Sequence, residues 1–104
     1  LVGNIATEVF SRFNLDLVFM GTHGMDIEFG FSSPNLVEAD TNREVIRRAA
    51  KFVILADSTK WGSRGFTSFA ELSEADTVIT TEGLDPAALA TLRENVSEVL
   101  LARP

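Results

Sequence analysis

Residues 52–60 read FVILADSTK, and this stretch decides the fold class of the chain. Its first five residues are apolar without interruption, which is typical of a parallel strand that is covered on both faces. Its last four residues are polar and indicate a turn directly after that strand. Comparable apolar runs predict three further strands, near residues 16–20, 77–80 and 97–102.

Amphipathic segments alternate with these strands and are predicted as helices. Apolar residues recur at helical spacing over residues 4–13. A second helix is predicted over about 38–51, with Thr41 as its N-cap because a glutamate follows three positions later. The third helix has the clearest start, since Asp85 can cap it and Pro86 suits its first position.

The remaining segments are less regular. A long glycine-punctuated loop is predicted over residues 21–30, and residues 66–72 fit either a short strand or a turn of helix. Alternating strands and helices with short connections predict an α/β fold, with a mostly parallel, Rossmann-like sheet and helices on its faces.

Three polar turns follow the first three predicted strands. They begin at Gly21, Asp57 and Thr81. Because parallel strands end at the same edge of a sheet, we expect the three turns to meet there. Ligands of such sheets bind beyond the carboxyl ends of the strands, so this edge is the candidate site.

The first turn offers backbone groups to an anion. Gly21 and Gly24 allow N–H groups to approach a ligand closely, and Thr22 adds a hydroxyl. The spacing matches neither a P-loop nor a dinucleotide-binding motif. The alternative is that the glycines only permit a tight turn.

The second turn combines opposite charges. Asp57 can accept hydrogen bonds from hydroxyl groups, and Lys60 can bind a phosphate as a point charge. This pair suits a phosphorylated sugar or polyol, and the alternative is a local ion pair. We expect both residues to contact a ligand.

The composition excludes several classes of function. The 104 residues include no cysteine and one histidine, His23, so we expect no cofactor, no metal site and no Ser-His-Asp triad. His23 is expected to be a surface or ligand-contacting side chain. A net charge of −6 argues against DNA binding by this segment alone. No apolar run is long enough to span a membrane, and we expect a soluble, cytoplasmic domain.

The motifs taken in order show a resemblance to a known family. The stretch DLVFMG at residues 16–21 is followed by Gly24, then by ILADSTKWG at residues 54–62 and DTVITT at residues 76–81. This pattern resembles the C-terminal effector domain of DeoR-family transcriptional regulators, which are bacterial repressors of sugar metabolism. The resemblance spans nearly all of the chain. One departure is Thr81, where family members often carry an aspartate.

The resemblance implies a fold related to ribose-5-phosphate isomerase and coenzyme A transferase domains. It also implies a phosphorylated sugar or related metabolite as inducer, with Gly21 and Gly24 in one ligand loop and Asp57 and Lys60 in another. DNA would be bound only through a winged helix-turn-helix absent from residues 1–104, which we expect to be an effector domain truncated on its N-terminal side. We expect a homo-oligomer in the full-length protein, and no enzyme; a sugar-phosphate isomerase of the same architecture is the alternative.

Overall fold

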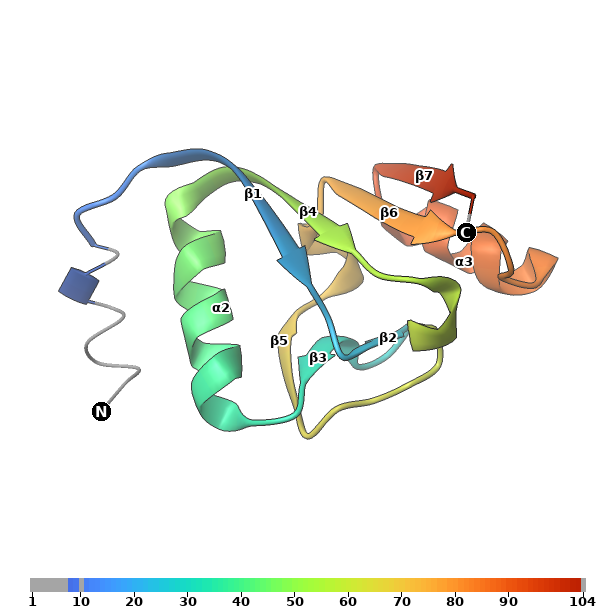
Figure 1. Ribbon diagram of the computed structural model, residues 1–104, viewed down its shortest axis with the longest axis horizontal. Helices are drawn as coiled ribbons and strands as arrows, with labels where there is room; N and C mark the ends of the chain where they lie inside the picture. The colour runs from blue at the N-terminus through green and yellow to red at the C-terminus, as the bar shows by residue number, and fades with distance from the viewer. Residues whose placement is uncertain (1–7, 10, 104) are drawn as a thin grey trace.

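The computed structural model describes residues 8, 9 and 11–103 (Figure 1). Four strands form a wholly parallel sheet in the order β1-β4-β6-β7. They are β1 (Leu15–Gly21), β4 (Ala49–Leu55), β6 (Thr77–Thr81) and β7 (Glu98–Ala102). The predicted α/β fold with a parallel sheet is therefore confirmed. Half of the helix predicted over residues 4–13, namely residues 4–7 and 10, lies outside the described residues.

The third predicted helix is confirmed with its cap. Helix α3 covers Pro86–Asn95, and the carboxylate of Asp85 accepts a hydrogen bond of 2.8 Å from the Ala88 N–H. An aspartate cap followed by proline is a purely local signal, and such signals are readable in the sequence.

The second helix begins earlier than the sequence predicts. Helix α2 covers Leu36–Arg48, and its N-cap is Asn35, whose side chain accepts a 2.8 Å hydrogen bond from the Glu38 N–H. Thr41 as N-cap is wrong, because Asn35 already starts the helix and leaves Thr41 in its second turn. The helix also ends earlier, because Ala49 is extended and pairs with β1.

A second, antiparallel sheet replaces the predicted loop. Its order is β2-β3-β5, formed by β2 (Gly24–Asp26), β3 (Gly30–Ser33) and β5 (Thr67–Ala70). The prediction of an irregular loop over residues 21–30 is wrong, because the carboxylate of Asp26 accepts two backbone hydrogen bonds and closes a hairpin turn. The ambiguous segment near residue 70 is a strand, followed by a short 3-10 helix at Leu72–Glu74.

The two sheets and both helices share one hydrophobic core. Its fully buried side chains come from all of these elements: Met25 and Phe31 from the small sheet, Ile54 and Val78 from the large one, Ala39 from α2 and Leu92 from α3. These residues place the small sheet and the helices on one side of the parallel sheet (Figure 1). The core therefore lies between the layers.

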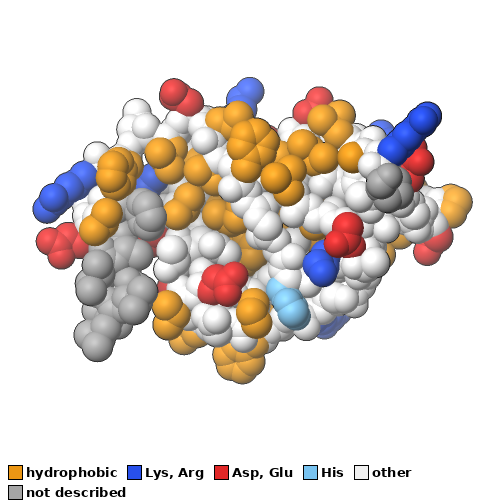
Figure 2. Space-filling view, viewed as in Figure 1, with side chains coloured by type: hydrophobic (Ala, Val, Ile, Leu, Met, Phe, Trp, Pro, Cys, Tyr) orange, Lys and Arg blue, Asp and Glu red, His pale blue; other side chains and the backbone are white. Residues whose placement is uncertain are grey.

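The opposite face of the parallel sheet carries exposed apolar side chains. Leu17, Phe19, Leu55 and Leu100 are 45–59% exposed. Figure 2 shows hydrophobic side chains in a row along the side of the molecule where β1 and β4 lie in Figure 1. Among the described residues, no helix is both long and apolar enough to cross a membrane.

Candidate functional site

The carboxyl ends of three parallel strands meet at one edge, as predicted. Gly21, the last residue of β1, is the register partner of Leu55, the last residue of β4. Leu55 in turn pairs with Ile79 of β6, which ends two residues later at Thr81. The polar turns that follow these strands therefore lie next to one another.

The turn after β4 is a short 3-10 helix over Ser58–Lys60 with Asp57 as its N-cap. The Asp57 carboxylate accepts a 2.8 Å hydrogen bond from the Thr59 N–H and a second bond from the Thr59 hydroxyl. These bonds, together with the charge of Lys60, lower the pKa of Asp57 below its ordinary value. The exposed carboxylate is therefore ionised at neutral pH and faces solvent in a fixed orientation.

Lys60 is not paired with this carboxylate. In the part of the chain that the structure describes, no ion pair within 4.0 Å joins Lys60 to Asp57, and the Lys60 ammonium group donates no hydrogen bond. The local ion pair that was the alternative from the sequence is thus not formed. An ammonium group with unused donors, in an acidic chain, is available to an anion.

Thr81 holds the turn in place, a role that the sequence did not reveal. Its hydroxyl oxygen accepts a hydrogen bond of 2.9 Å from the Ser58 N–H. The turn after β6 thereby fixes the turn after β4. The departure from the family pattern at Thr81 consequently leaves a polar, structural contact at this edge.

Gly24 is required by packing. It is buried in β2, and a Cβ atom at this position would lie 2.1 Å from the carbonyl oxygen of Ser63. The segment after the 3-10 helix runs alongside β2. Met25 pairs there with Trp61, and the Met25 carbonyl accepts a 2.7 Å hydrogen bond from the Gly62 N–H. Gly24 therefore allows two segments to approach closely.

The other residues of the first turn differ in how they are used. A Cβ atom at Gly21 would have room, since its nearest neighbour is 4.0 Å away. The Thr22 hydroxyl donates a 2.7 Å hydrogen bond to the Gly24 carbonyl and accepts one from the Ser32 N–H. The Thr22 hydroxyl, which the sequence predicts to contact a ligand, thus stabilises the hairpin. His23 is exposed beside it.

A cavity of about 370 Å³ opens beside Gly21 and Thr22. Gly24, Asp57 and Lys60 do not line it. The cavity is lined by Met20, Gly21, Thr22, His23, Ser32, Pro34, Glu38, Asn42 and Phe69. The predicted site residues therefore share one edge of the sheet but are divided between this cavity and the turn after β4.

Glu38 and Asn42 are the lining residues that sequence reasoning missed. They lie one turn apart on α2, a spacing that places two side chains on the same face of a helix. With the helix starting near Thr41, Glu38 would not share that face. The signal that would have found them is Asn35, a strong N-cap residue just after a proline.

No group of three or more histidine, cysteine, aspartate or glutamate side chains that could hold a metal ion occurs among the described residues.

Comparisons with known proteins agree on one family. The family model of the DeoR C terminal sensor domain matches residues 1–82. The chain is 44% identical over 85 residues to the HTH-type transcriptional regulator GlpR of Haloferax volcanii, covering 82% of this chain and 33% of that protein. It is 31% identical over 97 residues to the uncharacterized HTH-type transcriptional regulator YulB of Bacillus subtilis, covering 93% and 38% respectively.

A further relative is a named repressor. The chain is 31% identical over 101 residues to the HTH-type transcriptional repressor GlcR of Bacillus subtilis, covering 97% of this chain and 39% of that protein. The chain thus spans about a third of the length of these curated relatives.

Proposed function

The chain belongs to the DeoR C-terminal sensor domain family, and on this premise we propose that it binds a phosphorylated sugar or related metabolite as the inducer of a transcriptional repressor. The observation that carries the proposal is the unpaired ammonium group of Lys60 at the carboxyl edge of the sheet. Beside it, the oriented carboxylate of Asp57 can accept hydrogen bonds from sugar hydroxyls. Together they complement both ends of a sugar phosphate.

We assign to each predicted site residue a role that its geometry supports. Lys60 supplies the positive charge that an anion needs near a surface of net negative charge. Gly21 lets the ligand approach the end of β1, because space is open around it. Thr22 and Gly24 act by holding the hairpin and the turn after β4 together.

The proposed output is control of DNA binding elsewhere in a longer protein. The relatives are named as HTH-type regulators, and the chain spans only about a third of their length. We propose that residues 1–104 work together with an N-terminal helix-turn-helix in a homo-oligomer, in the cytoplasm. On its own this acidic chain is expected to show no specific, salt-sensitive retardation of operator DNA.

The test uses the two lysines of the chain. Lys60→Ala and Asp57→Ala are made in the full-length protein, and inducer-dependent DNA release is measured with ribose and fructose phosphates. Lys51→Ala is the matched control, because Lys51 is the only other lysine and lies at the opposite end of β4. We expect the Lys60 and Asp57 variants to bind DNA but to stop responding. Release at wild-type inducer concentrations by both variants would contradict the proposal.

A second candidate function, sugar-phosphate isomerisation, is tested in the same samples. A general base would have to act on the substrate carbon, and Asp57 with Lys60 is the candidate pair for such roles. Thermal stabilisation by a sugar phosphate without turnover supports the sensor, and turnover that Asp57→Ala abolishes supports the enzyme.

A further inference from the structure

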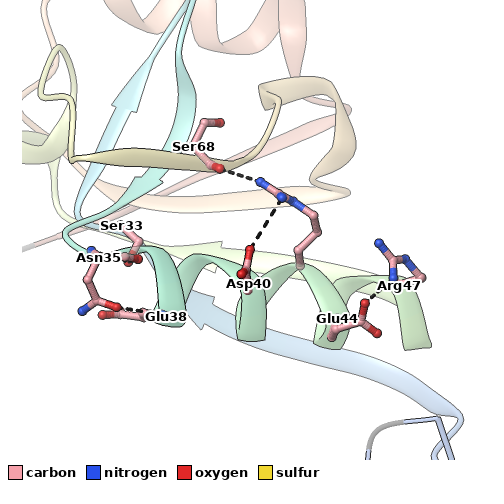
Figure 3. A network of polar contacts seen from close by, with 8 residues as sticks. Ser33, Asn35, Glu38, Asp40, Glu44, Arg47 and Ser68 are labelled. Atoms are coloured by element: carbon pink, nitrogen blue, oxygen red, sulfur yellow. Dashed lines mark hydrogen bonds and ion pairs between the residues drawn. The ribbon is translucent and has the colours of Figure 1, made fainter. Parts of the chain in front are cut away.

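Two polar side chains in the cavity beside Gly21 have no partner within the described part of the chain. The carboxylate of Glu38 and the side-chain amide of Asn42 take part in no hydrogen bond or ion pair there. Glu38 does interact with Asn35, but through its backbone N–H, as Figure 3 shows. Its carboxylate therefore remains free for a ligand.

Part of the cavity wall is apolar. Phe69 is buried and stacks against Phe31 with ring centroids 6.4 Å apart, and Met20 lies beside it in the cavity wall. The cavity thus combines an apolar wall with polar groups. The Glu38 carboxylate is a strong hydrogen-bond acceptor, the Asn42 amide both donates and accepts, and the His23 side chain also lines the cavity. This combination suits the hydroxyl groups and C–H faces of a carbohydrate.

The same chemistry disfavours an anion next to Glu38. A free carboxylate repels a phosphate, and among the described residues that line the cavity the only basic side chain is that of His23. The free positive charge at this edge is on Lys60, outside the cavity. A phosphorylated ligand is therefore oriented by charge, with its phosphate away from Glu38.

The cavity and the turn that carries Lys60 are close enough for one ligand to reach both. Gly21 lines the cavity and pairs with Leu55, and adjacent strands are about 4.8 Å apart. Asp57 follows Leu55 by two residues, a reach of at most about 7 Å. The turn that carries Lys60 therefore begins within roughly 12 Å of the cavity wall.

We infer that the cavity holds the hydroxylated carbon chain of the ligand, with Glu38 and Asn42 hydrogen-bonding to its hydroxyl groups while the phosphate lies toward Lys60. The inference rests on the proposed function and deepens it, because it assigns each end of the ligand to a different part of the edge. It makes Glu38 and Asn42 the residues that select among sugar phosphates.

The experiment measures dissociation constants by calorimetry on the full-length protein, with fructose 1-phosphate, ribose 5-phosphate and inorganic phosphate as probes. Glu38→Ala and Asn42→Ala are each expected to weaken sugar-phosphate binding about tenfold, since a hydrogen bond to a ligand contributes on that scale. Binding of inorganic phosphate should not change. Lys60→Ala should weaken both kinds of probe. Asp40→Asn is the matched control, because Asp40 lies on α2 but faces Arg43 at 3.9 Å and does not line the cavity.

The outcomes separate this inference from the function on which it rests. Wild-type affinity in both the Glu38 and Asn42 variants, with weakened binding in Lys60→Ala, overturns the inference and leaves the proposed function intact. Tighter sugar-phosphate binding by Glu38→Ala also overturns it, since the phosphate would then occupy the cavity. Failure of the full-length wild-type protein to bind either sugar phosphate contradicts the proposed function, and the inference falls with it.

Discussion

Replacing Gly24 by alanine tests whether this glycine serves packing or a ligand. The added methyl group would lie 2.1 Å from the Ser63 carbonyl oxygen, and a carbon and a carbonyl oxygen in contact are normally about 3.3–3.6 Å apart. The two segments must therefore separate by more than about 1 Å. At Gly21 the nearest neighbour of an added methyl is 4.0 Å away and φ is not positive, so Gly21→Ala is the matched control.

The magnitude follows from overpacking. Extra methyl groups in a well-packed site cost about 1–3 kcal/mol, and a blocking backbone carbonyl places Gly24→Ala near the upper end, about 2–3 kcal/mol. For a domain of this size each kcal/mol lowers the melting temperature by about 4–8 °C, so we expect a decrease of roughly 10–20 °C. Gly21→Ala should change stability by about 0.5 kcal/mol or less, because an alanine that fits also restricts the unfolded chain.

Thermal unfolding followed by circular dichroism, with urea titration as a second measure, distinguishes the two variants. Melting of Gly24→Ala within about 2 °C of Gly21→Ala would refute the packing argument. If Gly24 instead bound the ligand, its alanine variant would keep wild-type stability and lose affinity for the sugar phosphate.

Three further variants test other contacts. Burial alone would raise the pKa of Asp26. Hydrogen bonds from two backbone N–H groups and the interaction with Arg64 outweigh this effect and hold the pKa below its ordinary value of 3.8. The resulting stabilisation is fully present above the unfolded pKa of 3.8 and is lost as the pH falls through the lower pKa of the folded state. Below about pH 4, the urea midpoint of Asp26→Asn should therefore decrease less with falling pH than the wild-type midpoint does. Asp85→Ala should cost about 1 kcal/mol in urea unfolding, with recovery in Asp85→Ser; an unchanged midpoint would contradict the observed cap. Thr81→Val leaves the Ser58 N–H without its acceptor and should weaken sugar-phosphate binding in calorimetry, whereas Thr81→Ser should retain wild-type affinity.

The sequence predicts those parts of the fold whose signals are local. The four parallel strands are readable because each contains a short apolar run, and α3 is readable because Asp85 and Pro86 stand side by side at its start. The start of α2 was mispredicted because two cap signals compete, and Asn35 forms the observed one. The sequence alone does not show which of the two capping signals starts the helix.

The antiparallel sheet and the cavity depend on contacts that are distant in sequence. Strand β3 has four residues and pairs with β5, where Ser32 faces Ser68 across more than thirty residues. The cavity likewise joins Gly21 to Phe69. Hydrophobic periodicity in segments this short fits several structures, so only the tertiary arrangement decides. The edge of the site was therefore predictable, but its cavity was not.

The turn that carries Lys60 is attached to both sheets at once. It is bonded to Thr81 of the parallel sheet, while the segment that follows it is bonded to Met25 and Ser32 of the antiparallel sheet. Because this segment is hydrogen-bonded to both sheets, a displacement of Lys60 strains its contacts with each of them. Under the proposed function, a ligand bound at Lys60 would therefore act on a segment that is hydrogen-bonded to both sheets.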